Sequence, residues 1–363
     1  MVIPRLQTIS DTSCSSTTEQ GVAVHPFDAR VAERWDRFVS GHSDGTHCHL
    51  TAWKRVIEKT FGFQSCYAYA ERAGEITGVV PLFLVSNWVI GECLHSVPYG
   101  VYGGICAADE KSRDVLISHV KQLAVAKNVG HLELHQRRGE LFPDFHSNTL
   151  YTTFTTQLSG DPESNLKKLP RDTRYMIRKS EKTGLRVRHG VEQLKDFYAL
   201  FCESMRRLGT PVFPRLLFEN LFHEFGSCID LMMVYSGERP ITGVLSLFHR
   251  DAILPYYAGA SPDAPAMAAN NFMYWQLMKF AAESGFRTFD FGRSKRNTGA
   301  YQFKSQWGMT AEVLNYQVYL VRRKTAPNFS PVNPKFEMAG QVWRKLPLEL
   351  TKRLGPRIVR WFP

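Results

Sequence analysis

An eight-residue pattern occurs twice in the chain and constrains its fold more than any other feature. Ile76-Thr-Gly-Val-x-x-Leu-Phe83 recurs as Ile241-Thr-Gly-Val-x-x-Leu-Phe248, 165 residues further on. Each copy follows a predicted strand and a charged turn, Arg72-Ala-Gly74 in the first half and the Ser236–Pro240 turn in the second. A repeat in the same structural context indicates two copies of one α/β unit, fused by duplication.

The hydrophobic patterns run in the same order in both halves, which supports the duplication. We expect helices over 32–39, 50–61, 114–127, 194–208, 215–225 and 271–284, and strands over 66–71, 76–85, 131–135, 231–235, 241–248, 253–257 and 287–291. The predicted fold class is α/β (α+β), with duplicated domains and mixed, mostly antiparallel sheets. We place a disordered N-terminus at 1–21, domain 1 at 22–160, domain 2 at 161–325 and a C-terminal tail at 326–363.

Charge and cysteine usage bound the partners and the compartment. The formal net charge is +11, which favours anionic partners such as RNA, phosphorylated nucleotides, acidic glycans or anionic lipid. The seven cysteines form no Cys-x-x-Cys pair, so we expect reduced thiols and a cytoplasmic protein. The longest apolar run, 79–90, contains Pro81 and Asn87 and is too short to span a bilayer.

Aromatic, cationic and glycine residues gather in the stretch 290–308. The predicted strand ends at Gly292, and alternation places Asp290 on the face opposite Phe289 and Phe291. Three cations follow in the predicted loop, and then Tyr301, Phe303, Lys304, Trp307 and Gly308. Such a composition at a strand-to-loop edge indicates a site. A basic surface loop with anchoring aromatics is the alternative.

Asp290-Phe-Gly-Arg-Ser, followed by Phe303-Lys-x-x-Trp-Gly308, resembles the signature of the FemAB-like branch of the GNAT acyltransferase superfamily. Within that branch the chain is similar to proteins associated with exosortase/PEP-CTERM and exopolysaccharide loci. The resemblance extends over roughly 22–322. It implies tandem GNAT-like domains and transfer of an aminoacyl or acyl group to an amine or hydroxyl of a cell-envelope or exopolysaccharide precursor.

The stretch 290–308 supplies the candidate catalytic residues Asp290, Lys304 and Tyr301. Asp290 could deprotonate the acceptor amine or orient another group, or simply bind a neighbouring loop. Lys304 and Arg293 could hold a phosphate or polarise a carbonyl. Tyr301 could donate a hydrogen bond to an oxyanion or pack in the core.

A run of cations separates the two halves. We predict a basic helix within 165–184, which starts near Pro170 and ends at Gly184. Arg171, Arg174 and Arg178 would lie on one face. A solvated face is the usual role of such a run, but the pattern also resembles the Fem family, in which this region approaches phosphate groups. We therefore assign these arginines to binding of a phosphorylated substrate.

Four further residues are candidates for substrate binding. Tyr102 and Gly103 lie in a glycine- and tyrosine-rich loop, where backbone amides could approach a ligand, although a turn that needs positive φ would explain the glycines equally well. Tyr257 and Asn271 flank the helix 271–284, a position that borders the donor site in GNAT-like folds. His42, His47 and His49 match no standard zinc spacing, so we expect no metal site.

The acyl donor stays open between two molecules, and we expect no tightly bound cofactor. Neither half contains the Arg/Gln-x-x-Gly-x-Gly/Ala loop with which acetyl-CoA enzymes bind a pyrophosphate. Aminoacyl-tRNA, the donor of the Fem enzymes, suits the positive charge. The coiled-coil arm that often accompanies that donor is missing, so acyl-CoA remains an alternative. No dinucleotide-binding, Walker or nucleophile-elbow motif occurs, which leaves dehydrogenase, NTPase and serine hydrolase functions without support.

Two alternative functions accompany the acyltransferase prediction. One is a non-catalytic protein that binds RNA or a glycan on a degenerate acyltransferase fold, and the other is an acetyl-CoA-dependent N-acetyltransferase. The tail 336–361 is basic and amphipathic. We expect it to dock on the core, with peripheral contact with the inner membrane as the alternative.

Overall fold

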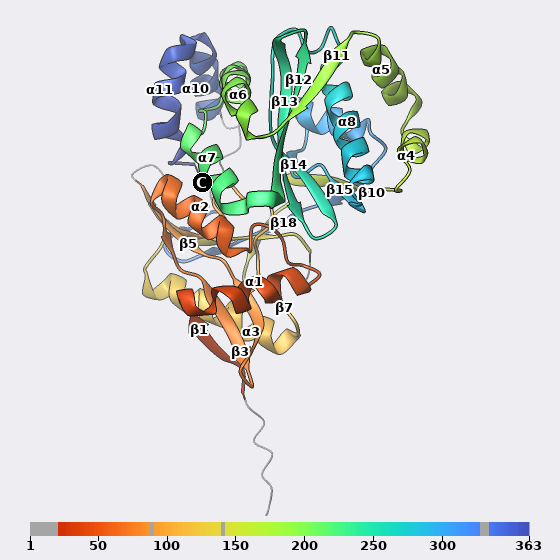
Figure 1. Cartoon of the computed structure of the whole chain (residues 1–363). Coiled ribbons are helices and arrows are strands. Elements are labelled where there is room, and N and C mark those ends of the chain that lie inside the picture. The colour runs from red at the N-terminus through yellow and green to blue at the C-terminus, as the bar shows by residue number, and fades with distance from the viewer. Residues whose placement is uncertain (1–20, 88–90, 139–141, 327–333, 363) are drawn as a thin grey trace, which may run out of the picture.

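The computed structural model describes residues 21–87, 91–138, 142–326 and 334–362. The chain forms two lobes, the first half in red to yellow and the second in green to blue (Figure 1). Three sheets and their helices make up the described residues, and the sheets are mixed and mostly antiparallel. The predicted α/β class is therefore confirmed.

The first sheet of the first half has four antiparallel strands. Their order is β1 (Ala23–Pro26), β3 (Ala68–Arg72), β4 (Glu75–Val80) and β7 (Cys106–Ala107). Helix α3 (Glu110–Ala126) packs against this sheet, and α1 (Ala32–Gly41) contacts β4. Helix α3 begins earlier than predicted, because the Asp109 side chain accepts a hydrogen bond from the Ser112 amide and caps it.

The second sheet has six strands and receives one of them from the end of the second half. Its order is β2 (Gln64–Ser65), β5 (Phe83–Asn87), β6 (Gly91–His95), β8 (His131–Gln136), β18 (Asn315–Leu320) and β9 (His146–Asn148). β6 and β8 are parallel, and the other pairs are antiparallel.

The strand predicted over 76–85 is wrong as a single element. The chain leaves the first sheet at Val80 and enters the second at Phe83. Pro81 lies at the change of sheet, where it has no amide hydrogen to offer to a ladder. The second copy of the repeated pattern lies in one unbroken strand, β13 (Arg239–His249). The two copies therefore begin in the same way, on a strand after a turn, but only the second continues to its last residue in the same strand.

The third sheet has eight strands and belongs mainly to the second half. Its path runs β11 (Leu185–His189), β12 (Ile229–Ser236), β13, β14 (Ala252–Ala260), β15 (Thr288–Asp290), β10 (Tyr151–Gln157) and β16 (Ser294–Lys295), and β17 (Thr310–Val313) also pairs with β10. Successive residues of β12 face opposite sides: Met232 and Val234 enter one core cluster, Met233 and Tyr235 the other.

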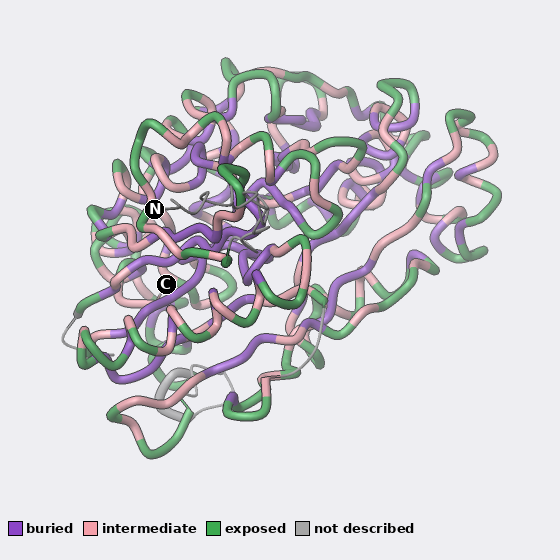
Figure 2. Tube along the Cα trace, turned by 90° about the horizontal axis from the view of Figure 1, so that it is seen from below, coloured by how far each residue is buried: buried purple, intermediate pink, exposed green. Residues whose placement is uncertain are grey.

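Helices cover both faces of the third sheet. Helices α5 (Arg171–Glu181) and α8 (Ala269–Glu283) share a core with one face. Helices α6 (Leu194–Leu208) and α7 (Arg215–Phe225) lie on the other, where α7 contacts α2 (Thr51–Phe61) of the first half. This second core includes Trp53 and Phe218, so it is shared by both halves. Figure 2 shows the buried residues along the interior of the molecule.

The two halves exchange strands. β10 precedes residue 160 but pairs within the third sheet, and β18 follows residue 161 but pairs within the second. The division between 22–160 and 161–325 stays a prediction, because the sheet topology places one strand of each half in the other. The exchange also brings β8, β10, β15 and β18 to one junction.

The basic helix predicted to start near Pro170 and to end at Gly184 is confirmed as α5, which starts at Arg171, and a separate helix, α4 (Pro162–Lys168), precedes it within the same basic segment. Pro170 cannot continue the first helix and favours the start of the second. The segment after Thr298 is a short helix, α9 (Gly299–Ser305), where a loop was expected, and the Thr298 hydroxyl caps it.

The C-terminal tail docks on the core, as expected. Helices α10 (Pro334–Lys345) and α11 (Leu348–Val359) contact α6. Val359 is buried, and its carbonyl accepts a hydrogen bond of 3.2 Å from the Tyr99 hydroxyl of the first half. Arg206 of α6 donates to the carbonyl of Leu346. Among the described residues, no helix combines the length and apolar character that crossing a membrane requires.

Candidate functional site

Asp290 closes β15 at the junction of the two halves. Phe289 and Phe291 on either side of it are buried in one core, with their rings 5.2 Å apart. The carboxylate of Asp290 lies on the other side of the strand and is only 4% exposed. The predicted alternation is therefore confirmed, and it turns the carboxylate toward the first half.

The carboxylate of Asp290 is surrounded by donors. Oδ1 accepts hydrogen bonds of 2.8 Å from the Thr153 hydroxyl and 2.8 Å from the Gly292 amide. The Tyr102 hydroxyl lies 3.1 Å from both carboxylate oxygens, and an Nη2 atom of Arg137 lies 3.2 Å from Oδ2. A carboxylate held by this many donors is suited to positioning its neighbours, which is the second of the roles that the sequence left open.

The sequence did not single out Arg137. It directly follows β8, and its guanidinium lies 4.7 Å from the centroid of the Tyr102 ring. It therefore joins the aromatic loop of the first half to Asp290 through a cation–π contact and an ion pair. A cation at the end of a predicted strand is a weak signal, because Arg138 beside it has the same charge but pairs with Glu312, to which Nε of Arg137 also lies 3.8 Å away.

Lys304 lies on α9 and folds back toward the loop that follows β15. Its ammonium nitrogen donates to the carbonyl of Phe291 at 2.5 Å, and it lies 3.4 Å and 3.5 Å from the carbonyl oxygens of Gly292 and Arg293. Burial lowers the pKa of Lys304 to about 8, and the nearby Asp290 opposes this shift. Lys304 is therefore a half-buried cation whose charge is easily lost.

Arg293 extends toward the first half and lies among tyrosines. Its guanidinium is 5.0 Å from the ring centroid of Tyr151 and 5.9 Å from that of Tyr316, and Nη1 lies 3.5 Å from the Tyr316 hydroxyl. In the part of the chain that the structure describes, no carboxylate lies within ion-pair distance of Arg293. The tyrosines of β10 and β18 could not be found from the sequence, because strand exchange brings them here.

Tyr301 does not join the cluster around Asp290. Its ring packs edge-on against Phe154 at 5.2 Å, on the face of β10 that enters the core shared with α5 and α8. Trp307 is 1% exposed and contacts the rings of Phe291 and Phe303. These contacts anchor α9 on the core. The role of Tyr301 as a hydrogen-bond donor to an oxyanion stays a prediction.

The basic arginines of α5 have different surroundings. Arg171 and Arg178 are exposed, as a role in binding requires. Arg174 instead donates to the carbonyls of Lys167 and Leu169 at the end of α4, so it caps that helix. Helix α5 also reaches the end of α9, because the Thr173 hydroxyl donates to the carbonyl of Gln306.

Gly103 does not present a free amide. Its N–H donates to the carbonyl of His135 at 3.0 Å. A Cβ atom there would lie 2.2 Å from Cγ1 of Val97, so close approach of the backbone requires glycine. Positive φ is not the reason: in this loop it is Tyr99 that adopts it, with φ of 61°. The glycine therefore serves the packing beneath Tyr102.

The remaining candidates lie apart from Asp290. The hydroxyl of Tyr257 on β14 is buried and has no hydrogen-bond partner among the described residues, and burial raises its pKa. Asn271 lies in the first turn of α8 and is half-buried. Their roles in substrate binding stay predictions.

The histidines near residue 47 make hydrogen bonds in the core. His49 is 3% exposed, with Nδ1 2.9 Å from the Thr46 hydroxyl and Nε2 3.0 Å from the carbonyl of Gly104. Nε2 of His47 lies 3.2 Å from Sγ of Cys48. Both ring nitrogens of His49 thus have partners, which is the structural role that the sequence favoured.

Surface hollows described in the structure do not coincide with the cluster. One of about 270 Å³ is lined by residues of the first half that include Asp44, Gln136 and Arg138, and another of about 610 Å³ lies over the outer face of α3. Neither includes Asp290, Arg293 or Lys304. We therefore assign the site from the residues around Asp290 and the loop after β15 rather than from a surface hollow.

Comparisons with known proteins show what the sequence of the chain resembles. A model of the acetyltransferase (GNAT) domain matches residues 167–305, which contain α5, β15 and α9. The lipid II:glycine glycyltransferase of Staphylococcus haemolyticus (strain JCSC1435) is 26% identical over 121 residues. That match covers 29% of this chain and 29% of the relative, so the chain spans less than a third of the curated relative's length.

Solved structures resemble the chain over both halves. The crystal structure of FemX has a TM-score of 0.64 at 17% identity, with 83% of this chain and 98% of FemX covered. A tandem GNAT protein from the clavulanic acid biosynthesis pathway has a TM-score of 0.52 at 9% identity, with 85% and 99% covered. These likenesses confirm the tandem GNAT-like fold that the repeated pattern and the motif predicted.

Proposed function

We propose that this chain, a FemAB-like acyltransferase of the GNAT superfamily, transfers an aminoacyl group to an amine or hydroxyl of a cell-wall precursor. The glycyltransferase named above and the likeness to FemX support the type of reaction and the type of acceptor. The residues at the end of β15 support the location that we propose for the active site.

The observation that carries the proposal is an excess of positive charge at that place. The ammonium of Lys304 donates to a carbonyl of the loop after β15, and Arg293 belongs to that loop and places its guanidinium over Tyr151. The carboxylate of Asp290, which precedes the loop, is already held by Tyr102 and Arg137. An excess of half-buried cations is stabilised by an anion, such as a substrate phosphate or the oxyanion that forms during acyl transfer.

The proposed reaction has three steps, and Lys304 and Arg293 can assist it. The nitrogen or oxygen of the acceptor attacks the acyl carbonyl, the bond from that carbonyl to the donor oxygen or sulfur breaks, and the acceptor proton leaves to a base or to water. Charge develops on the carbonyl oxygen during the attack, and a fixed cation lowers the barrier. We assign this role to Lys304 and phosphate binding to Arg293.

For the donor we propose aminoacyl-tRNA, with acyl-CoA as the alternative. The exposed Arg171 and Arg178 on α5 favour a polyanion, and α5 is connected to α9 through Thr173. A donor that binds only the folded chain raises its melting temperature as its concentration passes its Kd. We therefore propose a thermal-shift titration with aminoacyl-tRNA, deacylated tRNA, acetyl-CoA and longer acyl-CoAs.

Each donor gives a different outcome in that titration. A shift with aminoacyl-tRNA that exceeds the shift with deacylated tRNA supports the aminoacyl donor. A shift with CoA esters alone makes the chain an acyl-CoA enzyme. Equal shifts with all polyanions, without turnover, support the alternative of a non-catalytic RNA- or glycan-binding protein.

Peptidoglycan and exopolysaccharide precursors are both within the proposed acceptor class, and an assay with each acceptor separates them. We also propose that the chain acts on the cytoplasmic side of the inner membrane, where such precursors are made. Two apolar residues one helical turn apart on α10, Met338 and Val342, are 65% and 58% exposed and suit peripheral contact with a membrane. Liposome flotation of a Met338→Ser/Val342→Ser variant tests this contact without removing the docked tail.

A further inference from the structure

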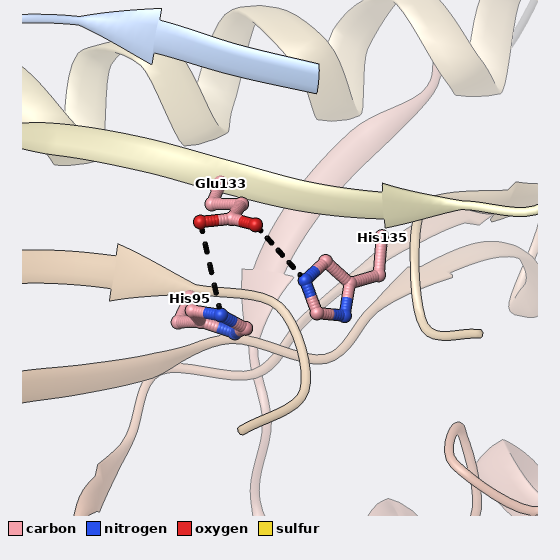
Figure 3. Close-up of side chains that lie close together, drawn as sticks. All are labelled: His95, Glu133 and His135. Atoms are coloured by element: carbon pink, nitrogen blue, oxygen red, sulfur yellow. Dashed lines mark hydrogen bonds and ion pairs between the residues drawn. The ribbon is translucent and has the colours of Figure 1, made fainter. Parts of the chain in front are cut away.

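Two histidines and a glutamate meet on one face of the second sheet. His95 on β6 and Glu133 on β8 are register partners in neighbouring parallel strands. His135 lies two residues beyond Glu133, so its side chain projects from the same face. Figure 3 shows the carboxylate of Glu133 between the two imidazole rings.

The side chains of the three residues place ligand atoms close enough to bind one ion. Nε2 of His135 lies 3.1 Å from Oε1 of Glu133, and Nε2 of His95 lies 3.9 Å from Oε2. One atom from each residue falls within a group that spans at most 4.8 Å. Bonds of about 2.0–2.1 Å at a tetrahedral centre separate their ligand atoms by roughly 3.4 Å. The observed distances lie on either side of this value.

The two ring nitrogens of His135 both face hydrogen-bond acceptors, and a neutral ring can donate to only one of them. Nδ1 lies 3.1 Å from the carbonyl of Gly100, and Nε2 lies 3.1 Å from the carboxylate of Glu133. Both neighbours are acceptors, but a neutral imidazole carries one N–H. If that proton is on Nδ1, the lone pair of Nε2 faces a carboxylate oxygen. A cation between the two atoms turns this repulsive contact into coordination, and the bond from Nδ1 to a carbonyl is the usual support of a metal-binding histidine.

Both histidines are buried, and one of their ring nitrogens has no partner. His95 is 4% and His135 3% exposed. Nδ1 of His95 is buried without a hydrogen-bond partner among the described residues. The two rings therefore offer buried nitrogens to an ion.

We propose that His95, Glu133 and His135 form a binding site for a divalent transition-metal ion, with Zn²⁺ as the ion that best fits two imidazoles and one carboxylate. This ligand set leaves at least one coordination position open. The sequence prediction of no metal site considered His42, His47 and His49. It had no signal for this group, because His95 lies on a different strand from Glu133 and His135.

The proposed ion would stabilise the base of the candidate functional site. The ring of Tyr316 stacks on His135 with centroids 3.9 Å apart, and Tyr316 also contacts Arg293. The Gly100 carbonyl that orients His135 belongs to the loop that carries Tyr102. An ion at Glu133 would therefore fix the strand and loop beneath these two tyrosines, independently of the proposed acyl transfer.

Metal analysis of the full-length chain tests the site directly. We would measure bound metal after purification, remove it with a chelator, and titrate the chain with Zn²⁺ and with Co²⁺, whose visible absorption reports nitrogen and oxygen ligands. We expect about one ion per chain and a melting temperature that rises with the ion. Glu133→Gln and His95→Gln should lose the bound ion and the Co²⁺ spectrum.

His131→Gln is the matched control, since His131 is a buried histidine of β8 outside this group of ligands. It should bind the ion as the natural chain does. Circular dichroism establishes which variants are folded before binding is compared. The site is rejected if the folded natural chain takes up neither ion, or if His95→Gln and Glu133→Gln bind as tightly as His131→Gln. ¹⁵N NMR that finds His135 doubly protonated in the natural chain, after exposure to Zn²⁺, also overturns the proposal, because an imidazolium satisfies both acceptors without an ion.

Discussion

The hydroxyl of Tyr102 lies 3.1 Å from both carboxylate oxygens of Asp290, although 188 residues separate them in the sequence. Tyr102 belongs to the first half and Asp290 to the second, so this contact joins the duplicated units. Arg137 closes the group through its ion pair with Asp290 and its position over the ring of Tyr102. Asp290, which the sequence offered as a candidate general base, is thus part of the contact between the two halves.

Asp290→Asn should destabilise the chain by about 3 kcal/mol, because a carboxylate that accepts several buried hydrogen bonds becomes an amide with one acceptor oxygen. The amide NH₂ would also face the donors of Tyr102 or Arg137. Urea unfolding measures the loss. Asp251→Asn is the control, since Asp251 is exposed and lies just before β14. If Asp290→Asn keeps full stability but loses turnover, Asp290 acts in the reaction and not through positioning.

Lys304→Met should reduce turnover at least about 100-fold, the usual effect of removing one group that stabilises an oxyanion. Methionine retains the apolar stem, so we expect the free energy of unfolding to change by only about 1 kcal/mol. The measurement is steady-state transfer at saturating donor and acceptor. Lys295→Met, on the neighbouring strand β16, should retain most of the activity. Equal losses in both variants would show that only the positive charge of this region matters.

The lowered pKa of Lys304 has a consequence for stability against pH. The folded chain releases this proton near pH 8, whereas an unfolded lysine keeps it until about 10.5. Between these values the unfolded state binds more protons, so the free energy of unfolding contributed by Lys304 rises with pH. Urea unfolding of the natural chain and of Lys304→Met at pH 7 and pH 9.5 should show a gain for the natural chain alone. If both change equally, the rise comes from other groups.

The order of elements could be predicted from the sequence because most strands and helices carry their own periodicity. The helix predicted over 194–208 and the strand predicted over 241–248 are of this kind. The exchange of β10 and β18 could not be predicted, since which sheet a strand joins depends on contacts far along the chain. Pro81 was a local signal for a strand break that the long apolar run obscured.

Only the part of the candidate site that is continuous in sequence could be identified before the structure. Asp290, Arg293 and Lys304 are close in sequence, and they are also close in the fold. Arg137 and Tyr316 come from other strands and carry no motif, so only the junction of the sheets identifies them.

Arg293→Met should leave the free energy of unfolding nearly unchanged. A half-buried cation without a carboxylate partner gains little from its surroundings, and its contact with Tyr151 contributes about 1 kcal/mol. The same change should remove most of the melting-temperature shift produced by an anionic substrate. Arg296→Met, in the exposed part of the same loop, should preserve that shift. A strong loss of stability in Arg293→Met would contradict the role in anion binding and assign Arg293 to the fold.

Substitutions of the exposed arginines of the basic segment and of its capping arginine should have different effects, the first on tRNA binding and the second on stability. Arg171→Ala/Arg178→Ala removes two exposed cations, so it should weaken tRNA binding and reduce the slope of log K against log salt by about 2, with little effect on unfolding. Arg174→Ala should instead lower the free energy of unfolding by about 1 kcal/mol, because the carbonyls of Lys167 and Leu169 lose their donor. Filter binding across a salt series and urea unfolding measure the two effects. If Arg174→Ala weakens binding as much as the double variant at unchanged stability, the whole face contacts the polyanion, and the cap that Arg174 makes in the free chain is exchanged for a phosphate on binding.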